Sequence, residues 1–253
     1  MSKAKQQPNS SCHSFLHILF CFACAFLLFC LFISATSLIK VSNAKKYYAE
    51  NYLKVNDFFV DEALIHNERD KEVYADLIYS SLLLFPEHVR PFIATDWSVV
   101  FTPEAPEGAA WYFPDGLNEQ DVTAVTVPSI KTVFVLTPDP ALIPYSLLHE
   151  FCHVLAFEYG EVDRSSQFYA LYNIYKDSYT ETFPFAVPHY SSSSPSEFFA
   201  ATLSSYLTER DHLKRSAPGI VDYMDSLLSK LPYENVLGKL GVRARGFLRA
   251  TMK

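Results

Sequence analysis

The sequence predicts an α+β fold in which a small mixed sheet packs on one central helix and further helices follow. Runs rich in β-branched and aromatic residues, which are typical of strands, lie between residues 97 and 136. From residue 139 onward the apolar residues recur at a spacing of three and four, which is typical of helices. The roughly 200 residues after residue 40 are enough for one domain with a sizeable core.

The N-terminal part of the chain has a different composition. Phe15 to Ile39 is a run of 25 residues without Asp, Glu, Lys or Arg, enough to cross a bilayer core of about 30 Å as a helix. We therefore expect a short tail at 1–14, a transmembrane signal anchor at 15–39, a stalk or a first helix at 40–56 and a folded domain at 57–253.

The same apolar run could instead be a signal peptide that is removed. Ala35-Thr36-Ser37 and Ser42-Asn43-Ala44 are both compatible with cleavage. The apolar region of a cleaved signal is usually only about 7–15 residues long, so the length favours an anchor and a single-pass membrane protein. The flanking lysines do not fix the orientation. A long folded domain crosses largely regardless of such charges, which favours an extracytoplasmic domain, with secretion as the alternative.

The folded domain begins with a helical pattern from Val60 to Phe85. Three strands are then predicted at Trp97–Phe101, Val122–Val127 and Lys131–Leu136. The third strand directly precedes the central helix, a placement that suits an edge strand to which a peptide substrate can add itself. An interior strand without a substrate role is the alternative. No cluster of Lys or Arg is long enough for a nucleic-acid surface, and the net charge is −7, so we expect no nucleic acid partner.

The central helix carries the sequence His149-Glu150-Phe151-Cys152-His153, which matches H-E-x-x-H. Asp139-Pro140 is a typical helix start and Gly160 a typical stop, so the pattern falls within a helix. Residues four apart lie on one face of a helix, where two imidazoles can share a zinc ion. A glutamate between them can take a proton from the water that the zinc activates. Two buried histidines with ordinary hydrogen bonds are the alternative.

The remaining helices are expected at Phe168–Tyr179, at about 194–209 and at about 218–231. A zinc hydrolase usually has a third protein ligand from a separate element, and Glu197 is the best candidate. However, Ser194-x-x-Glu197 also matches a capping box, in which the glutamate bonds back to the backbone. The spacing alone does not decide between a ligand and a cap.

Two motifs together resemble the catalytic domain of the anthrax toxin lethal factor family, which also includes secreted Pro-Pro endopeptidases. The first is H-E-x-x-H; the second has a tyrosine seven residues before Glu-Phe-Phe-Ala, here Tyr190 and Glu197–Ala200. The resemblance implies a zincin fold and a zinc metalloendopeptidase. It implies one zinc ion on His149, His153 and Glu197, with Glu150 as general base.

The resemblance also implies that Tyr190 donates a hydrogen bond to the oxyanion or the leaving amine. One position departs from the pattern: related zincins usually have an acid four residues after the third ligand, where this chain has Ala201. Such an acid orients a ligand histidine, and its loss typically costs about 10- to 100-fold in metal affinity or activity. A weak or inactive zincin that only binds a peptide or partner is therefore the rival interpretation.

Overall fold

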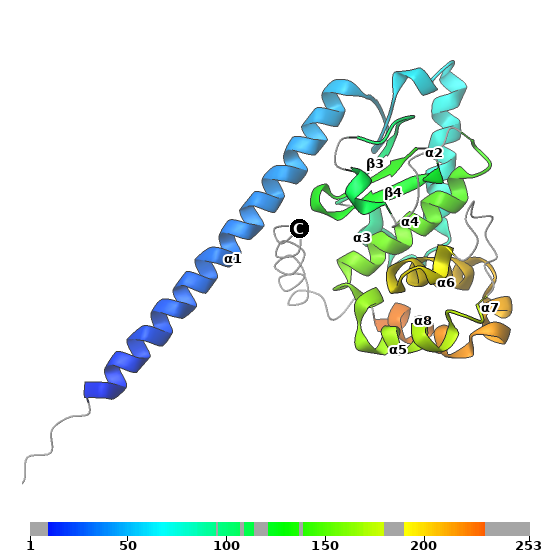
Figure 1. Cartoon of the computed structure of the whole chain (residues 1–253). Coiled ribbons are helices and arrows are strands. Elements are labelled where there is room, and N and C mark those ends of the chain that lie inside the picture. Colours follow the sequence, from blue (N-terminus) through cyan, green and yellow to red (C-terminus); the bar gives the residue numbers. More distant parts are fainter. Residues whose placement is uncertain are drawn as a thin grey trace, which may run out of the picture.

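The structure is a computed structural model, and it describes residues 10–94, 96–106, 109–113, 121–136, 139–179 and 190–230. It consists of one long N-terminal helix, α1 (Ser10–Asn51), and an α+β domain to which the last turns of that helix are attached (Figure 1). The α+β class and the small mixed sheet agree with the prediction.

The sheet has five short strands in the order β1-β2-β3-β5-β4. They are β1 (Leu53–Val55), β2 (Phe58–Val60), β3 (Ser98–Phe101), β4 (Ala124–Val127) and β5 (Thr132–Val135). The three central strands β2, β3 and β5 are parallel, whereas β1 and β4 run antiparallel to their neighbours. The sheet is therefore mixed, and β4 forms one of its edges.

The prediction of an edge strand at Lys131–Leu136 is wrong. In the structure β5 pairs with β3 through Val133–Val99 and with β4 through Val133–Thr126, so it lies inside the sheet. The chain reverses through the short helix η4 (Pro128–Ile130), and this reversal places the preceding strand, β4, at the edge. The position just before the central helix therefore belongs to an interior strand.

Both faces of the sheet are covered. Val99 and Phe101 of β3 belong to the larger core cluster, which the helices complete, whereas Val100 between them belongs to a smaller cluster on the other face. Alternate residues of a strand point to opposite faces, so every residue of such a strand is buried. This explains why the strands have continuous apolar sequences rather than an alternating pattern.

Helix α4 (Ile143–Glu158) is the centre of the domain and lies between the sheet and α6 (Figure 1). It begins at Ile143 rather than at Asp139-Pro140. Asp139 instead starts a turn, in which its backbone carbonyl accepts hydrogen bonds from the N–H groups of Leu142 and Ile143. It ends at Glu158, and Gly160, the predicted stop, follows two residues later with a φ of 93°, a left-handed conformation that glycine tolerates.

The other helices surround α4. The pattern predicted as one helix over 60–85 is in fact β2, a short 3-10 turn and then α2 (Glu68–Leu83), which an Asn67–Asp70 capping box starts. After it come α3 (Arg90–Ala94), α5 (Ser166–Tyr175), α6 (Pro195–Thr208), α7 (Arg210–Ser216) and α8 (Pro218–Lys230). The three helices predicted after the central one correspond to α5, α6 and α8.

Residues 40–56, for which the sequence leaves a stalk or a first helix open, form the end of α1 followed by β1. Tyr48 is buried against Phe59 and Phe134 on the second face of the sheet, and its hydroxyl donates to Thr132 Oγ1 at 3.3 Å. Burial raises the pKa of this phenol to about 12, so the group stays protonated. The last turns of α1 are therefore part of the domain rather than a free connection.

Candidate metal centre

Two helices bring the three predicted ligands together. His149 and His153 lie one turn apart on α4, and Glu197 lies in the first turn of α6. Glu197 Oε2 is 2.9 Å from His149 Nε2 and 3.4 Å from His153 Nε2, and the two Nε2 atoms are 3.2 Å apart. Two imidazole nitrogens and one carboxylate oxygen thus converge on one point.

The capping residue of α6 explains how Glu197 is free to reach this point. Ser194 Oγ accepts the backbone N–H of Glu197 at 3.1 Å, which caps the helix. The Glu197 side chain turns to His149 on the neighbouring helix. The serine of the Ser-x-x-Glu pattern is the cap, and the glutamate belongs to the histidine cluster.

The spacing of these atoms fits a zinc ion. In tetrahedral zinc sites the ligand atoms lie about 2.0–2.1 Å from the metal, which places them about 3.3 Å from one another. The three separations of 2.9, 3.2 and 3.4 Å are close to that value. The donor set of two histidines and one glutamate also occurs in catalytic zinc sites, which keep a fourth position open.

The carboxylate dominates the electrostatics of this cluster. Burial is the largest single influence on His153 and lowers its pKa, but the charge and hydrogen bond of Glu197, together with the charges of Glu150 and Asp163, outweigh it and raise this pKa to about 9. Burial would raise the pKa of Glu197, but the two histidines hold it well below its usual range. Glu197 is therefore ionised at neutral pH, the state that a metal ligand requires.

Glu150 lies beside the cluster. One oxygen or nitrogen from each of His149, Glu150 and His153 can be chosen so that all lie within 4.8 Å of one another. Its side chain accepts a hydrogen bond from Thr126 Oγ1 on β4 at 2.6 Å, and only 6% of the residue is exposed. The hydroxyl of an edge-strand residue thus holds this carboxylate in place while it faces the cavity.

Tyr190 also faces the cluster. It lies in the short helix η6 (Tyr190–Ser192), and its ring centre is 6.0 Å from that of His149. It lines the same cavity as Glu150 and Glu197. The preceding segment, 180–189, with His189, lies outside the described residues.

The carboxylate of Asp163 is linked to His153 through the hydroxyl of Ser196, a connection that the sequence does not predict. Ser196 Oγ donates to Asp163 Oδ2 at 2.7 Å and lies 3.5 Å from His153 Nδ1. Asp163 is buried, in the short helix η5 (Val162–Arg164) that follows α4. Ala201, where an acid was expected, is fully buried and apolar. No sequence pattern links residues 163 and 196, because only the packing of η5 on α6 brings them together.

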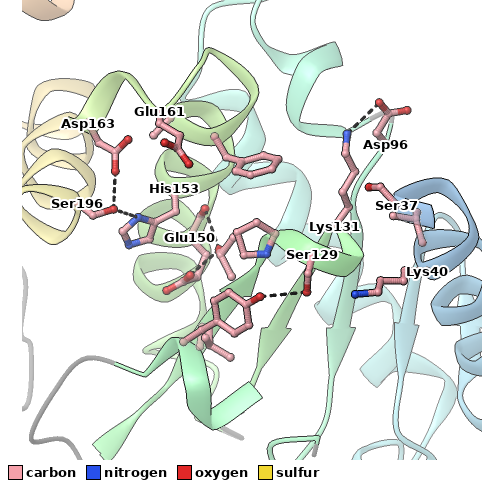
Figure 2. A pocket seen from close by; sticks show the side chains of 18 of the residues that line it. Ser37, Lys40, Asp96, Ser129, Lys131, Glu150, His153, Glu161, Asp163 and Ser196 are labelled. Carbon is pink, nitrogen blue, oxygen red and sulfur yellow. Dashed lines mark hydrogen bonds and ion pairs between the residues drawn. The ribbon is translucent and has the colours of Figure 1, made fainter. Parts of the chain in front are cut away.

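The cluster opens into a cavity of about 850 Å³ (Figure 2). One wall contains Glu150 and His153 of α4 together with Asp163 and Ser196, and the opposite wall contains Ser37 and Lys40 of α1. The edge strand β4 lines it between these walls with Ala124, Val125 and Thr126. The cavity is large enough for several side chains of a peptide.

Cys152, within the H-E-x-x-H sequence, takes no part in this cavity. It is fully buried beside Ser204, and burial raises the pKa of its thiol far above the usual range. A thiol in this state is neither a nucleophile nor a metal ligand, so Cys152 is a core residue.

No protein-family model and no curated protein matches the chain. Among solved structures, the chain is similar to the Pro-Pro endopeptidase PPEP-2 from Paenibacillus alvei, at 19% sequence identity and a TM-score of 0.46. That alignment covers 68% of this chain and 97% of the other chain. The assignment to the lethal factor family stays a hypothesis that rests on the two motifs.

Proposed function

We propose that this protein is a zinc-dependent endopeptidase, with His149, His153 and Glu197 as the zinc ligands and Glu150 as the general base. The observation that carries the proposal is the convergence of two Nε2 atoms and one carboxylate oxygen within 3.4 Å, with a second carboxylate beside them. A zinc ion in such a site lowers the pKa of a bound water and polarises the substrate carbonyl.

The protein's own groups supply the proton transfers. Glu150, oriented by Thr126, takes a proton from the attacking water and later gives it to the leaving amine. Tyr190, on the cavity wall beside His149, donates a hydrogen bond to the developing negative charge on the substrate oxygen. Each group is on the wall of one cavity, as this division of roles requires.

The substrate in this proposal is a peptide that binds along β4. Among the described residues β4 pairs with β5 alone, so its other edge can receive an extended peptide through main-chain hydrogen bonds. Thr126 of this strand contacts Glu150, so a peptide at that edge would pass directly over the general base. This strand takes the place of the one expected from the sequence.

The test is hydrolysis of a peptide library by the purified full chain in detergent. We expect cleavage that a chelator abolishes and that added zinc restores, because the ligands hold the metal reversibly. Mass spectrometry of the products identifies the bonds cut. Cleavage that persists at full rate after complete metal removal would contradict the proposal.

The rival function is a peptide-binding module that keeps the fold but has lost turnover. Ala201 favours it, because the residue cannot orient a ligand histidine as an acid would. The same peptide-library experiment distinguishes the two functions, because a binding module retains library peptides without cleaving them.

A further inference from the structure

The wall of the cavity opposite the catalytic cluster is the N-terminal helix. Ser37, Lys40, Val41 and Lys45 of α1 line the same cavity as Glu150 and its neighbours. Figure 2 shows Ser37 and Lys40 on α1 at the far side of the cavity from the α4 residues. A substrate in the cavity would therefore lie between α1 and α4.

This wall begins where the apolar run of α1 ends. Ile39 is the last residue of the uncharged run and Lys40 the first charged residue after it. The N-terminal side of the helix carries large exposed apolar side chains, among them Phe20, Phe22 and Phe26 at 67–72% exposure. An exposed apolar surface on a helix of this length and hydropathy is what a bilayer would cover.

No flexible connection separates the apolar run from the domain. Helix α1 is continuous from Ser10 to Asn51, and Tyr48, three residues beyond Lys45, is fixed in the core. Ser37 to Lys45 spans only about 12 Å along the axis at about 1.5 Å per residue. If the apolar run crosses a bilayer, the cavity opens within about two helical turns of its surface.

We propose that the substrate is the segment of another membrane-bound protein that lies directly outside the bilayer. This inference rests on the proposed peptidase function and on the insertion of α1 in a membrane. The continuous helix α1 holds the cavity at the membrane surface, so a peptide bond near that surface is presented to the cavity at high effective concentration. A bond far from the surface does not reach it.

The test places one peptide at different heights above a vesicle. The full chain is reconstituted in phosphatidylcholine vesicles with a peptide that the detergent-solubilised chain cleaves. A lipid anchor carries the peptide on helical Glu-Ala-Ala-Ala-Lys spacers of one, five or ten repeats, about 8, 38 and 75 Å long at about 1.5 Å per residue. We expect the peptide on the shortest spacer to be cleaved at least about tenfold faster than the peptide on the longest. A long, stiff spacer holds the peptide too far from the membrane surface to reach the cavity.

The control is the same three peptides without lipid, cleaved by the chain in detergent, where all three rates should agree. Equal rates on vesicles, or failure of the chain to enter vesicles, would overturn this inference and leave the peptidase proposal standing. Absence of cleavage by the detergent-solubilised chain would instead refute the peptidase function on which it rests. Mass spectrometry confirms that the same bond is cut in each case.

Discussion

Thr126 and Ser196 connect the cluster of His149, Glu150, His153 and Glu197 to the rest of the fold through single hydroxyl groups. Thr126 donates to Glu150, and Ser196 donates to Asp163 while lying next to His153. Both hydroxyls come from elements other than α4, namely β4 and α6. The orientation of the two α4 side chains thus depends on how the sheet and α6 pack on that helix.

Ser196→Ala is expected to weaken zinc binding by about 10- to 100-fold, the usual effect of losing the partner of a ligand histidine. Asp163→Asn should weaken it as well, and the double variant should add little, because both residues act through one hydrogen-bonded chain. Zinc affinity is measured by competition with a chromophoric chelator, and thermal unfolding of the metal-free protein checks that the fold is intact.

Arg164→Gln is the matched control for that series. Arg164 Nε lies 3.8 Å from Asp163 Oδ2, so this variant removes a charge partner of Asp163 without touching Ser196. It should bind zinc like the parent. If Ser196→Ala also binds zinc like the parent, the Asp163–Ser196–His153 chain has no role in holding the metal.

At the scale of residues, the sequence predicts the side chains that one helix places next to one another. His149, Glu150 and His153 could be assigned because the helical repeat alone places them on adjacent turns. The partner of His153 could not be predicted, since Asp163 reaches it only through a contact between η5 and α6. The choice between cap and ligand for Glu197 also needed the neighbouring helix in place.

At the scale of elements, the sequence predicts three of the five strands, β3, β4 and β5, but not β1, β2 or the strand order. Four residues of β4 and four of β5 are all buried, so neither sequence shows the polar face that would mark an edge. The order of strands depends on crossover connections far apart in the chain, which local sequence does not encode. The sequence of residues 40–56 does not decide between a stalk and a helix for a similar reason: the partners of Tyr48, Phe59 and Phe134, come from later strands.

The attachment of α1 gives a prediction about stability. Tyr48→Ala should lower the free energy of unfolding of the domain by about 3–5 kcal/mol, as for other buried aromatic residues. Tyr48→Phe keeps the packing and loses one hydrogen bond to Thr132, so it should cost only about 0.5–1.5 kcal/mol. Denaturant unfolding of both variants in detergent measures this difference. A Tyr48→Ala variant as stable as the parent would show that α1 is not part of the domain.

At the scale of the molecule, α1 is the one helix among the described residues that is long and apolar enough to cross a membrane, although a signal sequence has the same properties. Cleavage after Ala44 would leave Tyr48 in the second core cluster but would remove Ser37, Lys40 and Val41 from the wall of the cavity. Figure 1 shows the rest of α1 extending away from the domain.

We expect the mature protein to sediment with membranes and to resist extraction by salt or alkali, since about 25 uncharged residues anchor it. N-terminal sequencing of the mature chain shows whether the apolar run is retained. A mature N-terminus between Ala35 and Lys45 would show that the apolar run is a signal peptide and that the protein is secreted.

The central claim is that three residues hold the metal and a fourth performs the proton transfer, and one paired measurement tests it most directly. Zinc content and peptide hydrolysis are determined for the parent, Glu150→Gln and Glu197→Gln. The parent should hold about one zinc per chain and cleave. Glu150→Gln should keep the zinc and lose hydrolysis, because a base is not a ligand, whereas Glu197→Gln should lose both. A Glu150→Gln variant that cleaves as fast as the parent, or a Glu197→Gln variant that retains zinc at full occupancy and affinity, would contradict the assignment.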